Sequence, residues 1–109
     1  EVNVAGEESK FGFAPEEVEE AAREIAKYPH VHIQGLMTIA PFVDDPEENR
    51  PVFRSLYELS KTVAKEQIPD VSMEILSMGM TNDYMVAIEE GATMVRVGTG
   101  IFGERNYNI

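Results

Sequence analysis

The feature that most constrains this chain is a regular alternation of short apolar runs with longer amphipathic segments. Four apolar runs predict strands, at residues 2–5, 31–39, 71–76 and 94–97. The segments between them predict helices at residues 15–27, 47–67 and 82–90, and a last helical turn is expected at residues 101–105. Strands that alternate with helices are joined by right-handed crossovers and form a parallel sheet. The sequence therefore predicts an α/β fold.

Residues that commonly begin and end helices support these boundaries. Pro15 suits a first helical position, and the glutamates after it face the positive end of the helix dipole. Pro69 ends the second helix, whereas Thr81 is the expected N-cap of the third helix and Gly91 closes it.

The spacing of these units predicts half of a (β/α)₈ TIM barrel. Four units occupy 109 residues, so eight of them would need a little over 200, near the low end for this fold. We therefore expect residues 1–109 to form half of one barrel domain, and the family resemblance described below implies that this half comprises about the last four βα units. The chain begins at Glu1 inside an apolar run, so we expect these residues to be part of a longer protein. Two open sheet edges would need a missing N-terminal half or a second copy to close them.

The composition argues against several classes of function. With 20 acidic and 9 basic residues, the chain has a formal net charge of −11 and no basic surface for a nucleic acid or an anionic membrane. The absence of cysteine excludes disulfides and thiolate metal sites. His30 and His32 lie at a strand start, away from the expected site, so no metal is predicted. No membrane span or secretory signal is visible, and cytoplasm is the expected compartment.

Two glycine loops at the ends of consecutive strands are the strongest candidates for a binding site. Residues 77–80 follow the third strand, and residues 98–100 follow the fourth. Small residues with free N–H groups at a helix start suit a phosphate, and barrels often bind phosphate in the loops after strands seven and eight. The alternative is that these glycines serve turns only.

Arg96 is the single residue that most suggests a ligand. Strand alternation places it on the face opposite Val95 and Val97. An arginine that faces a barrel interior needs an acceptor or a ligand. An ion pair with a carboxylate of a neighbouring strand is the structural alternative, and the adjacent glycine loop favours the ligand.

Four motifs resemble those of the pyridoxal phosphate homeostasis protein family. The two C-terminal motifs are SMGMTND at residues 77–83 and VRVGTGIFG at residues 95–103. The others are VNV at residues 2–4 followed by EESKFGF at 7–13, and GLM at 35–37. This family shares the fold of the N-terminal barrel of bacterial alanine racemase, and its members bind pyridoxal 5′-phosphate (PLP).

The resemblance implies roles for residues of both loops. The positions expected to bind the cofactor phosphate are Ser77 with the backbone of Met78 and Gly79 on one side, and Gly98 and Thr99 on the other. Arg96 would face the pyridine nitrogen. Because a guanidinium stays protonated, it would donate to this nitrogen and leave the ring a weaker electron sink. The Schiff-base lysine of the family lies on the first barrel strand, which this chain does not include, and no catalytic residue is assigned.

The resemblance favours a non-catalytic carrier in intracellular PLP homeostasis, with PLP-dependent apo-enzymes as candidate partners. The alternative is an amino-acid (alanine) racemase-like enzyme, which would need a second acid/base group. Tyr84 and Tyr107 are the candidates near strand ends, but the chain leaves no room for the extra β-domain of racemases. A third possibility is an unrelated phosphate-binding half-barrel, in which Arg96 would have no ring nitrogen to meet.

Overall fold

Three of the predicted strands form one parallel sheet in the computed structural model, which describes residues 1–105. Strand β1 spans Ile33–Met37, β2 spans Val71–Met80 and β3 spans Met94–Arg96, in the order β1-β2-β3. Consecutive parallel strands need a crossover between them, and helices provide it here. The predicted α/β fold with a parallel sheet is thereby confirmed.

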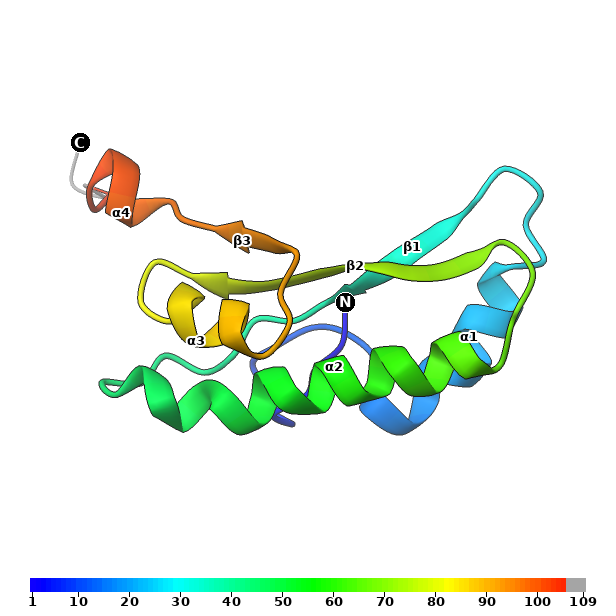
Figure 1. Cartoon of the computed structure of the whole chain (residues 1–109), viewed down its shortest axis with the longest axis horizontal. Helices are drawn as coiled ribbons and strands as arrows, with labels where there is room; N and C mark the ends of the chain where they lie inside the picture. The colour runs from blue at the N-terminus through cyan, green and yellow to red at the C-terminus, as the bar shows by residue number, and fades with distance from the viewer. Residues whose placement is uncertain (106–109) are drawn as a thin grey trace.

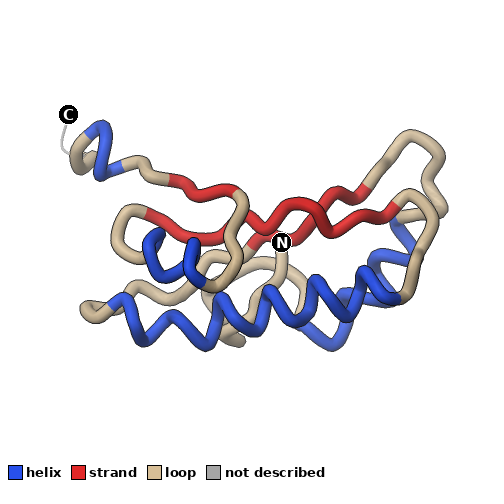
Figure 2. The backbone as a smooth tube through the Cα atoms, in the orientation of Figure 1, coloured by secondary structure: helices blue, strands red, loops and turns tan. Residues whose placement is uncertain are grey.

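The helices cover one face of this sheet, as Figures 1 and 2 show. They are α1 at Val18–Ile25, α2 at Arg50–Lys65 and α3 at Tyr84–Glu89. Short 3-10 helices, η1 at Pro15–Glu17 and η2 at Pro46–Asn49, lead into α1 and α2. The one-turn helix α4, at Thr99–Phe102, stands apart from the others beyond the end of β3 (Figure 1).

The core lies between the sheet and α2. Phe53, Leu56 and Val63 recur on one stripe of α2 and are fully buried against Leu76 and Met78 of β2. Residues three and four apart lie on one side of a helix, so this spacing directs the apolar stripe at the sheet.

The predicted strand at residues 2–5 is wrong. Val2 forms a single bridge with Phe13 and donates its N–H to the carbonyl of Met37 at 2.8 Å. The chain then turns, because the Asn3 side chain accepts from the N–H of Gly6 and donates to the carbonyl of Glu7. This side-chain hydrogen bonding competes with a strand ladder, and pairing does not extend beyond the single bridge.

The prediction that the third strand ends at Leu76 is also wrong, because β2 continues to Met80. Ser77 pairs with Met37 of β1 and with Met94 of β3, and Met80 pairs with Arg96. The register shifts between Ser77 and Met80, where Gly79 has a φ of 102°. Glycine here permits an irregularity within a strand, and the loop begins only at Thr81.

Helix boundaries differ from the prediction by a few residues. The segment 15–27 begins as a 3-10 helix and its α-helix ends at Ile25, while the last turn spans Thr99–Phe102 and not residues 101–105. Thr81 does not cap α3: the N-cap is Asp83, and the Thr81 hydroxyl accepts a hydrogen bond from the N–H of Gly100. Within residues 1–105, no helix is both long and apolar enough to cross a membrane.

Gly35 brings β1 and β2 together, which gives a first prediction. A Cβ at this position would overlap the carbonyl oxygen of Ile75 on the neighbouring strand. We expect Gly35→Ala to lower the free energy of unfolding by about 3 kcal/mol or more, because the backbones of two core strands would have to separate. Urea unfolding measures this change.

The matched control is Gln34→Ala, a change at an exposed position of the same strand. It is expected to cost less than about 1 kcal/mol. Equal stabilities of the two variants would show that β1 and β2 do not require this close approach.

Candidate functional site

The carboxyl ends of all three strands meet at the guanidinium of Arg96. Its Nη2 donates to the carbonyl of Thr38, just beyond β1, at 2.9 Å and lies 3.4 Å from the carbonyl of Ser77 on β2. Its Nη1 lies 3.6 Å from the sulfur of Met80, a weak acceptor. Arg96 therefore joins β3 to its neighbour β2 and to the end of β1.

The Nε of Arg96 has no acceptor in the part of the chain that the structure describes. This nitrogen is buried, and no described carboxylate forms an ion pair with the guanidinium. The structural ion pair considered as an alternative for Arg96 is thus not found in this part of the chain. Because buried donors are nearly always satisfied, the Nε is a position from which an additional acceptor would be held.

The residues of the first glycine loop fall on the last part of β2. Met78 is fully buried, and its side chain belongs to the core. A Cβ on Gly79 would lie 2.7 Å from the Cβ of Ala87 and 3.1 Å from the Cα of Tyr84. The close approach of α3 therefore explains this glycine without a ligand. Ser77 is half-buried beside Arg96.

In the second loop, neither backbone conformation nor close packing explains why residue 98 is a glycine. Its φ of −93° suits any residue, and a Cβ there would have no atom of the described chain within 4 Å. Its carbonyl accepts from the N–H groups of Ile101 and Phe102. The N–H groups of Gly98 and Thr99 precede this turn, and no acceptor for them is found in residues 1–105. Open space and two free donors thus coincide at this loop.

A buried polar pair fixes the turn after β2. The carboxylate of Asp83 accepts from the N–H of Met80 at 2.7 Å and from the Asn49 side chain at 2.9 Å. The same Asn49 amide donates to the carbonyl of Pro41 at 2.8 Å. Both side chains are buried, and they tie together the segments that follow β1 and β2.

Sequence reasoning missed Asn49 and the role of Asp83. Asp83 stands in the motif at residues 77–83, but nothing in the sequence near Asn49 indicates its partner 34 positions away. A polar residue that precedes an amphipathic helix is ordinarily taken as a cap. Asn49 is the N-cap of α2, but its side chain makes no capping hydrogen bond and binds Pro41 and Asp83 instead.

Ion pairs hold α3 against α2. Arg50 contacts Glu47 at 2.8 Å, Glu89 at 2.6 Å and Glu90 at 2.7 Å, and Arg54 contacts Glu90 at 3.0 Å. Hydrogen bonds from Arg54 and Arg50 hold the pKa of the Glu90 carboxyl below its ordinary value. Because α3 packs on Gly79, this network also supports the end of β2.

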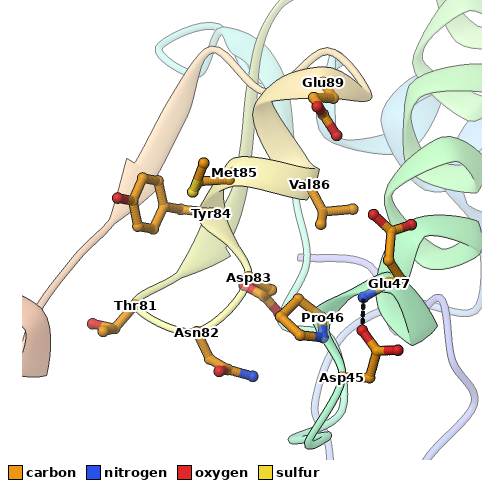
Figure 3. A pocket seen from close by; sticks show the side chains of 10 residues that line it. All are labelled: Asp45, Pro46, Glu47, Thr81, Asn82, Asp83, Tyr84, Met85, Val86 and Glu89. Carbon is orange, nitrogen blue, oxygen red and sulfur yellow. Dashed lines mark hydrogen bonds between the residues drawn. The ribbon is translucent and has the colours of Figure 1, made fainter.

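A cleft of about 340 Å³ lies between η2 and α3 (Figure 3). Its acidic side chains already have partners: Asp45 accepts from the N–H of Glu47, and both Glu47 and Glu89 pair with Arg50. Tyr84, one of the candidate acid/base groups, lines this cleft, whereas Tyr107 lies outside the described residues.

The histidines lie at the other end of the sheet, before β1. His32 Nδ1 is 3.4 Å from the Asp70 carboxylate, and both side chains are exposed. No group of three or more potential metal ligands is found within residues 1–105.

Comparison with known proteins gives the family. A family model described as "Alanine racemase, N-terminal domain" matches residues 1–106. The chain belongs to this family. Together with the parallel sheet, the match confirms an α/β fold of the alanine racemase N-terminal type.

Similar members of the alanine racemase N-terminal domain family are named pyridoxal phosphate homeostasis proteins. The protein of Aquifex aeolicus is 50% identical over 107 residues, which cover 98% of this chain and 46% of that protein. The human protein is 42% identical over an alignment of 111 residues, which covers 99% of this chain and 40% of the human protein. The resemblance inferred from the four motifs is thereby confirmed, and the chain spans less than half the length of these relatives.

Two solved structures of PipY from Synechococcus elongatus are also similar. The structure without PLP has a TM-score of 0.83 at 32% identity and covers 94% of this chain and 47% of that one. The structure with PLP bound has a TM-score of 0.76 at 33% identity, and the match covers 87% of this chain and 44% of the PipY chain.

The buried Asn49–Asp83 pair gives a second prediction. Asn49→Ala removes the donor to two buried acceptors, the Oδ2 of Asp83 and the Pro41 carbonyl, and is expected to lower the free energy of unfolding by about 2 to 3 kcal/mol. Asn82 is the matched control, because it donates a bond of equal length, 2.8 Å, to the carbonyl of Val43 at an exposed position. Asn82→Ala should cost less than about 1 kcal/mol in urea unfolding. Equal costs would contradict a special role for the buried pair.

The Glu90 network gives a third prediction, on the pH dependence of stability. A carboxyl with a lowered pKa in the folded state contributes stability above its unfolded-state pKa, and this contribution disappears as the pH falls through the folded-state pKa. Glu90→Gln is therefore expected to flatten the decline of the unfolding free energy as the pH falls from about 5, near the ordinary carboxyl pKa, to about 3. Glu16→Gln, on η1, is the control. An unchanged pH profile in Glu90→Gln would show that the network does not contribute.

Proposed function

We propose that this chain is a PLP-binding part of a protein of intracellular PLP homeostasis. The observation that carries the proposal is the guanidinium of Arg96, which joins the three strands and whose buried Nε has no acceptor within residues 1–105. The names of the relatives and the PLP-bound structure of PipY support PLP as the ligand.

The residues present fit this cofactor. Arg96 would donate to the pyridine nitrogen, and the N–H groups of Gly98 and Thr99, which have no acceptor within residues 1–105, would bind the phosphate. The open space at the Cβ position of Gly98 admits a group close to the backbone. On the other side, Ser77 and the backbone of Met78 and Gly79 complete the proposed set of phosphate ligands. The close packing of α3 also accounts for the glycine at position 79.

Arg96 agrees with a carrier but does not exclude an enzyme, because PLP enzymes place either an aspartate or an arginine against the ring nitrogen. Bound PLP supplies an electron-withdrawing ring to amino-acid chemistry, and this capacity is greatest when the ring nitrogen is protonated. A guanidinium does not release its proton in the accessible pH range, so Arg96 holds the nitrogen as an acceptor. The names of the relatives as homeostasis proteins support the same reading.

We further propose that residues 1–109 form the C-terminal half, about the last four βα units, of a single (β/α)₈ TIM barrel domain. The face of the sheet opposite α1, α2 and α3 carries no described helix, and β3 stands at an edge of the sheet. A missing N-terminal half would pair with that edge and supply the Schiff-base lysine, and a second copy is the other means of closing the sheet. PLP-dependent apo-enzymes of the cytoplasm are the proposed recipients.

The fourth prediction tests this proposal by cofactor retention. PLP is added to the full-length protein and to residues 1–109 alone, and retained PLP is measured by absorbance after gel filtration. We expect retention by the full-length protein and much weaker retention by residues 1–109, because the lysine lies outside them. Loss of all PLP from the full-length protein would refute the proposal, and alanine racemisation above background would favour the racemase-like alternative.

Arg96→Glu in the full-length protein tests the assignment of the ring nitrogen. A carboxylate there favours a protonated nitrogen, so the visible absorption of the bound cofactor should shift. Arg23→Glu, an equal charge change at an exposed position of α1, is the control and should leave the spectrum unchanged. Identical spectra for both variants would exclude contact between Arg96 and the ring.

A further inference from the structure

Three consecutive residues after β2 each hold a different part of the chain. Thr81 accepts from the N–H of Gly100 at 3.0 Å, Asn82 donates to the carbonyl of Val43 at 2.8 Å, and Asp83 accepts from Asn49 at 2.9 Å. The side chains of Thr81 and Asn82 point in different directions from the turn (Figure 3). Asn82 and Asp83 fix the turn to the body of the protein, and Thr81 is thereby a fixed point for the segment that follows β3.

Helix α4 has little else to hold it. Its side chains at Ile101 and Phe102 are 68% and 86% exposed, and a helix of one turn is not stable by itself. Its remaining backbone hydrogen bonds stay within residues 98–103. Among residues 1–105, the bond from Gly100 to Thr81 is the one hydrogen bond that joins α4 to the rest of the chain.

The packing at Gly100 supports the same contact. A Cβ on Gly100 would lie 2.9 Å from the Cγ2 of Thr81 and 2.9 Å from the Cγ1 of Val97. The backbone of Gly100 therefore rests directly on the Thr81 side chain, with the methyl group in contact and the hydroxyl bonded to the N–H. Both the position and the orientation of the segment 98–100 depend on this residue.

We propose that Thr81 is a positioning residue that fixes the N–H groups of Gly98 and Thr99 in the orientation that binds a phosphate monoester. The inference rests on the proposed function, because it takes these N–H groups as the phosphate ligands. Thr81 itself acts through Gly100, one residue beyond Thr99. Its hydroxyl thus contributes to the choice between phosphorylated and unphosphorylated forms of the cofactor.

The fifth prediction compares three threonine variants in the full-length protein. Thr81→Val removes the hydroxyl and keeps the shape, and it should weaken PLP binding about fivefold, the equivalent of one hydrogen bond of about 1 kcal/mol. Binding of pyridoxal, which lacks the phosphate, should not change. Thr81→Ser keeps the hydroxyl and should bind PLP like the unsubstituted protein. Thr62→Val, on the exposed side of α2, is the control for the substitution itself.

A second measurement separates this inference from the proposed function. Amide hydrogen exchange without ligand should be faster at residues 98–102 in Thr81→Val than in Thr81→Ser. Equal loss of PLP and pyridoxal binding, or unchanged exchange, would overturn the positioning role of Thr81 alone. Failure of the unsubstituted full-length protein to bind PLP would instead overturn the proposed function, and the role of Thr81 in cofactor binding with it.

Discussion

The guanidinium of Arg96 joins all three strands of this sheet near their carboxyl ends. One guanidinium reaches the carbonyl of Thr38 beyond β1 and that of Ser77 on β2 while its own backbone belongs to β3. Five donors in a rigid plane make arginine suited to joining several acceptors at once. The arrangement of the strand ends, and of the loops that leave them, depends on this contact.

The parts of the fold that follow from periodicity were predictable from the sequence. The stripe of Phe53, Leu56 and Val63 marks α2, and the run at residues 71–76 marks most of β2. The errors occur where a single local interaction overrides the pattern. Asn3 turns the chain out of a strand, and Gly79 is accommodated inside one although glycine ordinarily signals a turn.

The candidate site was predictable only in part, for a related reason. Glycines and an arginine at strand ends are visible in a sequence, and the motifs around Gly98 and Arg96 resemble those of a known family. The polar residues that hold these loops are not visible, because Asn49, Asp83 and Thr81 act through partners that are 34 or 19 positions away, or that belong to the backbone. Such pairings exist only once the strands have fixed the distances between the loops.

The single side-chain amide of Asn49 has a mechanical consequence. Its nitrogen donates to Pro41 and to Asp83, and the angle between the two hydrogens of a planar amide is set by covalent geometry. The Asn49 amide therefore fixes the distance between the loop that contains Pro41 and the turn that contains Asp83. A displacement of one of them is transmitted to the other. A glutamine at position 49 would place the amide one methylene group farther from the backbone. An aspartate would lack the two N–H hydrogens that form these hydrogen bonds.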